Sequence, residues 1–165
     1  MILGISITST SQIIPAITLA KLVKNENENI IVVLGGNVLS RLHKNVLMKF
    51  LHFFNFIDAI IVFEGEDSLY KFIEYYPKQR YDLLTNLIFK DKNRKIRTKL
   101  SLSMIHNLDL LPFPDFSDLP LDKYLSPCLI LPTYSSRGCY WGKCAFCAHG
   151  YIYKNNYREI NRESY

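Results

Sequence analysis

Strand-length apolar runs alternate with helical patterns through the first 76 residues, and this alternation constrains the fold more than any other feature of the sequence. Three runs are apolar and rich in β-branched residues: 1–8, 29–36 and 56–66. Each is followed by apolar residues at helical spacing, over 11–25, 37–54 and 66–76. Strands that are apolar on both faces and separated by helices are typical of parallel sheets covered by helices. The sequence therefore predicts an α/β fold with a parallel sheet.

The second of these strands ends in two glycines, Gly35 and Gly36. Open α/β sheets bind ligands at the carboxyl ends of their strands, so the pair is a candidate ligand contact. It is equally consistent with a tight turn from strand to helix, which glycine permits. Both interpretations stay open.

Beyond the alternation, the chain changes character. Residues 86–101 predict a β-hairpin with "DKNRK" at its turn. Residues 108–127 contain four prolines and no periodicity, which indicates an extended connector. Residues 128–134, "CLILPTY", predict a further strand.

Composition places the chain among globular proteins, because 48% of its residues are hydrophobic and 21% are charged. The net charge of +5 owes much to the basic run Lys90–Lys99. A solvated hairpin is the favoured interpretation of this run. A nucleic-acid-binding patch, helped by the aromatic residues after Gly150, is the alternative.

The sequence gives no sign of export or membrane insertion. The most apolar window, Phe50–Phe63, is interrupted by His52, Asn55 and Asp58, which argues against a membrane span. No secretory pattern opens the chain. The cytoplasm is therefore the expected location, and clustered cysteines there act as metal ligands or redox groups rather than as disulfides.

Three cysteines lie within nine residues of "SSRGCYWGKCAFCAHG". Cys139, Cys144 and Cys147 have the spacing C-x4-C-x2-C, and Gly138 and Gly142 permit a tight loop around one centre. Arg137 and Lys143 add positive charge, which favours thiolates. Thiolates bind zinc and iron–sulfur clusters.

Two metal centres fit these ligands. With His149, the three cysteines could form a Cys₃His zinc site in a small interaction module. A [4Fe-4S] cluster held by three cysteines would instead leave one iron open for an exogenous ligand, as an enzyme would need. The cluster is favoured because His149 follows Cys147 too closely for easy tetrahedral closure.

The segment "SRGCYWGKCAFC" resembles the cluster loop of radical S-adenosylmethionine enzymes, although the first gap has four residues where the commonest pattern has three. "YKNNYREINRES", residues 153–164, resembles the segment that enters the first helix of their barrel. The resemblance implies that Cys139, Cys144 and Cys147 ligate a [4Fe-4S] cluster. It also implies that Phe146 lies against the adenine of S-adenosylmethionine.

The preceding residues resemble the cobalamin-dependent branch of that family, in which a Rossmann-like cobalamin-binding domain comes before the barrel. "GISITS", "VVLGG" and "AIIVFEGE" resemble the third, fourth and fifth strands of that domain. Carried over by position, the residues near cobalamin would be Ser6, Thr8, Gly35 and Gly36. Glu64 and Glu66 would lie in the loop after the last strand.

The resemblance implies three parts: a partial cobalamin-binding domain (1–80), a hairpin and proline-rich linker (81–127), and the start of a radical SAM (β/α) barrel (128–165). We expect a fragment of an enzyme that reductively cleaves S-adenosylmethionine for C-methylation or a related radical modification. None of its own residues is expected to be catalytic. An electron donor such as flavodoxin or ferredoxin and a small-molecule or peptide substrate are the expected partners, and no nucleic acid or membrane.

Overall fold

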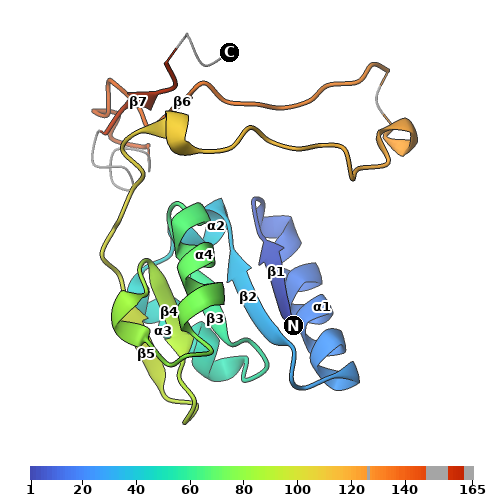
Figure 1. The fold of residues 1–165 in the computed structure, drawn as a ribbon, viewed down its shortest axis with the longest axis vertical. Coiled ribbons are helices and arrows are strands. Elements are labelled where there is room, and N and C mark those ends of the chain that lie inside the picture. Colours follow the sequence, from blue (N-terminus) through green and yellow to red (C-terminus); the bar gives the residue numbers. More distant parts are fainter. Residues whose placement is uncertain (126, 148–155, 162–165) are drawn as a thin grey trace. The chain divides into compact units, whose positions relative to one another are not determined.

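The computed structural model describes residues 1–125, 127–147 and 156–161. The chain divides into two compact units, Met1–Ile105 and His106–Tyr165, and each is described by itself. Figure 1 shows the first unit as a sheet flanked by helices, whereas the described part of the second unit is mostly extended chain.

A five-stranded sheet in the order β1-β2-β3-β4-β5 forms the centre of the first unit. Its strands are β1 (Ile2–Ser6), β2 (Ile31–Gly35), β3 (Ala59–Ile61), β4 (Leu87–Lys90) and β5 (Ile96–Lys99). The first three strands run parallel, while β4 is antiparallel to β3 and β5 is antiparallel to β4. The predicted α/β fold is confirmed, and so is parallel pairing for the first three strands. The sheet as a whole is mixed, because the predicted hairpin β4–β5 extends it with antiparallel strands (Figure 1).

Helices follow each parallel strand, as the alternating pattern predicts. They are the short 3-10 helix η1 (Thr10–Gln12), α1 (Ile13–Glu26), α2 (Asn37–Ser40), α3 (Lys44–Phe53), α4 (Glu66–Tyr75) and the 3-10 helix η2 (Tyr81–Leu83). Pro15 is compatible with α1 because it lies in the first turn, where a backbone N–H has no partner within the helix.

The prediction of one continuous helix over 37–54 is wrong, because two side chains interrupt it. The Ser40 hydroxyl donates to the Gly36 carbonyl at 3.2 Å and accepts from the Phe63 N–H at 2.8 Å, which ends α2 and ties it to the segment after β3. His43 then caps α3, since its Nδ1 accepts a hydrogen bond from the Asn45 N–H at 3.2 Å.

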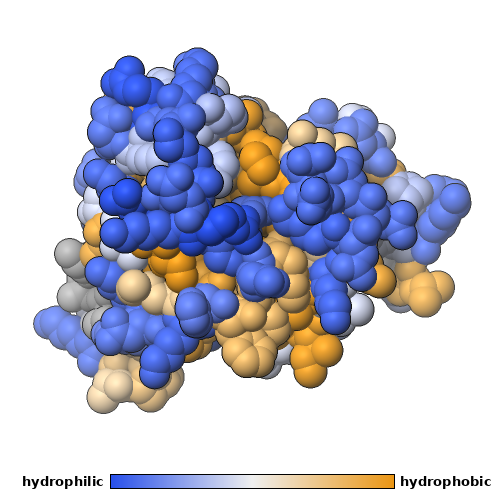
Figure 2. Space-filling model, turned by 90° about the horizontal axis from the view of Figure 1, so that it is seen from below, coloured by the Kyte–Doolittle hydropathy of each residue, from blue (hydrophilic) through white to orange (hydrophobic). Residues whose placement is uncertain are grey.

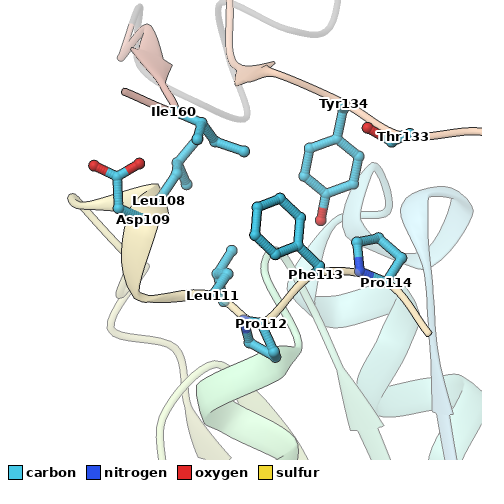
Figure 3. A pocket seen from close by; sticks show the side chains of 9 residues that line it. All are labelled: Leu108, Asp109, Leu111, Pro112, Phe113, Pro114, Thr133, Tyr134 and Ile160. Carbon is cyan, nitrogen blue, oxygen red and sulfur yellow. The ribbon is translucent and has the colours of Figure 1, made fainter. Parts of the chain in front are cut away.

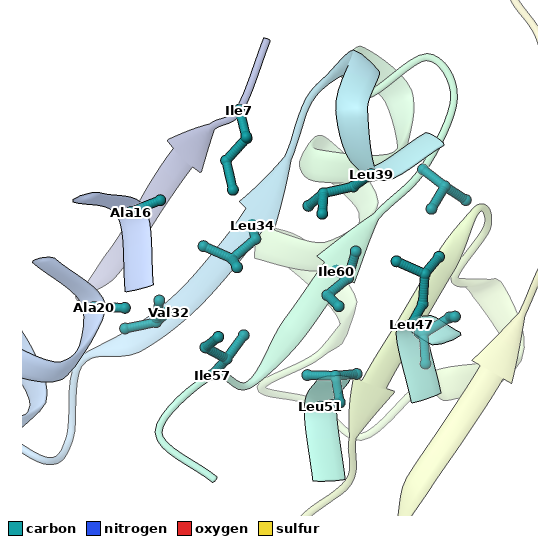
Figure 4. Packing of buried hydrophobic residues seen from close by; sticks show 12 residues of the cluster. Ile7, Ala16, Ala20, Val32, Leu34, Leu39, Leu47, Leu51, Ile57 and Ile60 are labelled. Carbon is teal, nitrogen blue, oxygen red and sulfur yellow. The ribbon is translucent and has the colours of Figure 1, made fainter. Parts of the chain in front are cut away.

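Each face of the sheet buries its own apolar cluster, as expected for strands that alternate side chains between two covered faces. On one face, Val32, Leu34 and Ile60 pack with residues of α1, α2 and α3, and Figure 4 shows this packing. On the other face, Val33 and Ile61 pack with Phe72 of α4. The helices therefore cover both faces of the sheet.

A buried carboxylate anchors several elements at the start of β3. Asp58 is 3% exposed, and its side chain forms ion pairs of 2.7 Å with Lys24 of α1 and with Arg94 of the hairpin turn. It also accepts a hydrogen bond from the Val32 N–H at 2.8 Å. Nearby, the Lys90 ammonium donates to the carbonyls of Ile57 (2.7 Å) and Phe54 (3.1 Å). The basic residues Lys90 and Arg94 of the hairpin thus stabilise the fold by binding the segment that leads into β3.

The second unit contains little regular structure among its described residues. Its elements are the 3-10 helices η3 (Leu108–Leu110) and η4 (Leu121–Lys123) and the short antiparallel strands β6 (Ser136–Arg137) and β7 (Arg158–Glu159). The expected strand over 128–134 is wrong: the run is extended, but it has no strand partner among the described residues. High β-propensity does not make a strand without a neighbour to bond.

Apolar side chains remain exposed in the second unit, including those of Leu125, Leu129 and Ile130; Ile130 is 70% exposed.

On the face of the chain drawn in Figure 2, hydrophobic residues interrupt a largely hydrophilic surface. Among the described residues, no helix is both long enough and apolar enough to cross a membrane.

Candidate functional site

The first candidate site is the edge of the sheet where β1 and β2 end. The parallel register pairs Ser6 with Gly35, so two of the predicted contact residues lie side by side. Ser6 and Thr8 are exposed, and Gly35 is half-buried.

A side chain that the sequence analysis did not single out organises the turn after β1. The Gln12 Oε1 atom accepts hydrogen bonds from the N–H groups of Thr8 (2.8 Å) and Ser9 (3.0 Å) and from the Thr8 hydroxyl (3.1 Å). This is a capping box, and its signal was available in the sequence as Ser9 followed three residues later by Gln12. The Thr8 hydroxyl is therefore committed to the turn as a donor.

The two glycines differ in what they do. Gly36 has φ +104°, and a Cβ atom there would lie 2.4 Å from the Ile7 carbonyl oxygen and 2.6 Å from the Ile7 nitrogen. A Cβ at Gly35 would make only ordinary contacts, at 3.8 Å or more with Ile61. Packing against the chain's own backbone thus accounts for Gly36, whereas nothing within the fold demands glycine at position 35.

The two acidic residues after β3, Glu64 and Glu66, have different structural roles. Glu64 is 7% exposed, and its carboxylate accepts a hydrogen bond from the Ile105 N–H at 3.0 Å, which holds the end of the first unit in place. Glu66 begins helix α4 rather than lying in a loop, and its negative charge there favours the helix N-terminus.

The second candidate site is the cysteine loop, which is closed at its base by β6 and β7. Arg137 pairs with Arg158 in the ladder, and the Ile160 N–H donates to the Ser135 carbonyl at 2.8 Å. Gly138 follows directly with φ +88°, and a Cβ there would lie 1.9 Å from the Asn156 carbonyl oxygen. The described part of residues 153–164 contains the short strand β7, and Gly138 is required for the two strands to meet.

The three thiols of the loop are accessible and not in disulfides. Cys144 is exposed, and Cys139 and Cys147 are partly exposed. The Gly142 N–H lies 3.5 Å from the Cys139 sulfur as a donor, and the Cys147 N–H donates to the Cys144 carbonyl at 3.1 Å. The backbone donor directed at sulfur, the Gly142 N–H, suits a thiolate that binds a metal.

Two positively charged side chains flank the thiols, and each of them lies over an aromatic ring. The Arg137 guanidinium lies 4.7 Å from the centre of the Tyr134 ring and donates to its hydroxyl, and the Lys143 ammonium lies 5.4 Å from the centre of the Trp141 ring. Phe146, predicted to contact adenine, is 94% exposed and so is available for stacking.

The three thiols are of the type that binds a soft metal, although the structure does not group them around a common centre. Three thiols, a tight loop and an N–H directed at one sulfur match an iron–sulfur or zinc ligand set. Among the described residues, however, no three His, Cys, Asp or Glu side chains are grouped as a metal site. His149, the fourth ligand of the zinc alternative, lies outside the described residues.

A cavity of about 70 Å³ lies within the second unit, beside the base of the cysteine loop. Phe113 and Tyr134 form its aromatic walls, as Figure 3 shows, and Ile160 and Leu111 complete the apolar lining. The Asp109 carboxylate at its rim accepts a hydrogen bond from the Asn161 N–H at 2.8 Å. The residues after β7 are thereby joined to η3.

No protein-family model matches the chain. The chain is 32% identical over 161 residues to a protein of Pyrococcus horikoshii that is named an uncharacterized methyltransferase. The match covers 95% of this chain and 33% of that protein, so the chain spans about a third of the length of its relative. Because the match covers nearly all of the chain, it runs through both structural units.

Proposed function

We propose that the chain is part of a methyltransferase of the radical S-adenosylmethionine class. The observation that carries this proposal is the cysteine loop: three accessible thiols spaced C-x4-C-x2-C, with the exposed ring of Phe146 directly before the last of them. The similarity to a protein named a methyltransferase supports the transfer of a methyl group. S-adenosylmethionine is accordingly the proposed co-substrate.

Cys139, Cys144 and Cys147 would hold a [4Fe-4S] cluster. Bound there, a cluster with one iron free of protein ligands supplies an electron for the reductive cleavage of S-adenosylmethionine. The protein's own contribution is to position the thiols, through Gly138 and the β6–β7 ladder, and to offer Phe146 to an adenine ring. None of these residues needs to carry a proton or act as a nucleophile.

Cobalamin is proposed as a second cofactor at the edge of the sheet where β1 and β2 end. The exposed hydroxyl of Ser6, and a glycine at position 35 that the fold itself does not require, are the features that favour a ligand there. Thr8 would contribute through its turn, and Gly36 only by shaping the backbone. In this proposal residues 1–80 are the cobalamin-binding part, 81–127 the hairpin and proline-rich linker, and 128–165 the start of the barrel. A flavodoxin- or ferredoxin-like reductant would supply electrons.

Anaerobic reconstitution with iron and sulfide tests the cluster directly. We expect the chain to gain the broad visible absorbance of an iron–sulfur cluster with about four irons per chain. Replacing Cys139, Cys144 or Cys147 by Ala should abolish both signals. Cys128→Ala is the matched control, because Cys128 is the fourth cysteine of the chain but lies outside the loop. It should load as much iron as the parent chain.

Addition of S-adenosylmethionine provides the second readout. A bound co-substrate should change the electron paramagnetic resonance spectrum of the reduced cluster, and Phe146→Ala should weaken that change without lowering the iron content. A colourless protein that retains one zinc per chain would refute the cluster and favour the zinc-binding module. Iron content that is insensitive to all three cysteine substitutions would refute the cluster, and zinc content that is equally insensitive would refute the zinc-binding module.

A further inference from the structure

The segments that follow the parallel strands β1, β2 and β3 are joined to one another at the carboxyl edge of the sheet. The Ile7 N–H donates to the Gly35 carbonyl at 2.8 Å, and the Val38 N–H donates to the Ile7 carbonyl at 3.2 Å, which joins the first segment to the second. The Phe63 N–H donates to the Ser40 hydroxyl at 2.8 Å, which joins the second segment to the third. Backbone groups make the first connection, whereas a side chain makes the second.

The hydroxyl of Ser40 is used both as a donor and as an acceptor. It donates to the Gly36 carbonyl at 3.2 Å while it accepts from the Phe63 N–H. Ser40 is half-buried, so an alkyl side chain in its place would leave the Phe63 N–H without this acceptor in a region with little water. Only a residue with a hydroxyl of similar reach can replace both bonds.

Phe63 has a backbone conformation that a bulky residue seldom adopts. Its φ of +62° lies in the left-handed region, where the Cβ atom comes too close to the following carbonyl oxygen. The ring packs against the apolar cluster that contains Leu34 and Ile60, so the core holds the side chain while Ser40 holds the backbone N–H. The strained residue thus lies two positions after β3, at the carboxyl edge of the sheet.

Stability alone does not account for the contact between Ser40 and Phe63. The strain of a bulky residue in the left-handed region is about as large as the gain from one ordinary hydrogen bond. The contact therefore adds little net stability to the fold. Its larger effect is on geometry, because it fixes the path of the chain between β3 and α4. Backbone strain that the surroundings hold in place is found preferentially at ligand sites.

We propose that Ser40 is a positioning residue for cobalamin at this edge. The inference rests on the proposed function, in which cobalamin binds where β1 and β2 end. Ser40 acts through the backbone rather than by touching the ligand, because its hydroxyl holds the segments after β2 and β3 in one arrangement before cobalamin arrives. A site that is ordered before binding has a higher affinity, since the cost of ordering it does not reduce the binding free energy.

Titration with hydroxocobalamin, followed by absorbance at a temperature where circular dichroism shows each variant folded, separates positioning from stability. Ser40→Ala should raise the dissociation constant at least about tenfold, whereas Ser40→Thr, which keeps a hydroxyl, should stay within about threefold of the parent chain. Thr18→Ala is the matched control. The Thr18 hydroxyl also donates to the carbonyl four residues before it, that of Ile14 at 2.9 Å, but it does so within α1. This variant should bind like the parent chain.

Hydrogen exchange of the Phe63 amide, measured without cobalamin, gives an independent readout. Ser40→Ala should speed this exchange at least about tenfold, and Ser40→Thr should leave it unchanged. A parent chain that does not bind hydroxocobalamin would refute the proposed cofactor and this inference with it. A parent chain that binds, together with a Ser40→Ala variant that binds equally well, would overturn the positioning role alone. Weak binding by Ser40→Thr with a protected Phe63 amide would overturn it too.

Discussion

The backbone of Ile7 lies so close to Gly36 that no side chain fits at this position. Its φ of +104° and the close approach of the Ile7 backbone mean that any side chain must displace main-chain atoms. We expect Gly36→Ala to lower the free energy of unfolding by more than about 2 kcal/mol. Gly35→Ala, where a Cβ makes ordinary contacts, should cost less than about 1 kcal/mol. Urea unfolding of both variants checks the difference, and equal effects would contradict the assigned role.

Lys90 makes the stability of the sheet depend on pH. Burial, together with the positive charge of Arg94, lowers the pKa of its ammonium to about 8, while Asp58 opposes the shift. Between pH 8 and the ordinary lysine pKa of 10.5, the unfolded chain binds a proton that the folded chain has released. Stability should therefore rise with pH in this window, by at most about 1.4 kcal/mol per pH unit.

The measurement is the free energy of unfolding in urea at pH 7.5 and pH 9.5, compared with Lys90→Met. The parent chain should gain stability relative to the variant as the pH rises. The range stops below pH 10 because burial raises the pKa of Tyr76 to about 12, so that its ordinary ionisation in the unfolded chain begins to oppose folding above that point. A parent chain that loses stability relative to Lys90→Met would contradict the assignment.

At the scale of elements, the short β6–β7 ladder has only two residue pairs, but it determines how the cysteine loop is closed. It closes the cysteine loop, and it does so only because Gly138 has no side chain to strike the Asn156 carbonyl. We expect Gly138→Ala to reduce iron retention after reconstitution at least about fivefold, although all three thiols remain. Gly35→Ala, in the other unit, should leave iron retention unchanged. Full loading of Gly138→Ala would show that the ladder is dispensable.

The parallel strands and most helices follow from the sequence because local and long-range preferences agree there. Residues 29–36 are both β-prone and buried on two faces, and β2 forms within them. The break between α2 and α3 does not follow, since apolar periodicity continues through it. It arises from Ser40, whose hydroxyl binds Phe63, a residue 23 positions away. Such a contact is invisible to a local pattern.

The residues 128–134 illustrate the opposite failure. Their composition favours a strand, yet a strand forms only where a neighbouring strand supplies hydrogen bonds. Among the described residues, no strand pairs with residues 128–134. The cysteine loop was predictable from spacing, because thiol chemistry depends on residue type. Its closure by β7 was not, because a strand of two residues, Arg158 and Glu159, leaves no periodic pattern in the sequence.

At the scale of the whole molecule, the first unit contains the means to fold alone. Among the described residues, both apolar clusters draw their members from positions up to Leu100. We expect residues 1–105 to unfold cooperatively, with a midpoint within about 5 °C of the complete chain. Residues 1–80, which end before β4, should not fold, because Leu87, Ile88 and Phe89 are each 0% exposed in the sheet core. Circular dichroism during heating distinguishes the two, and a folded 1–80 would refute the prediction.

This division sets an order for maturation. The sheet is complete at residue 105, so it can form during synthesis before Cys139 has been added to the chain. Loading of the proposed metal is then a late step on a protein that is already half folded. Oxidative loss of the metal would spare the sheet, and repair would require only reinsertion rather than refolding. Exposure of reconstituted protein to air, followed by renewed iron and sulfide, should restore the visible absorbance while the thermal unfolding of the sheet stays constant throughout.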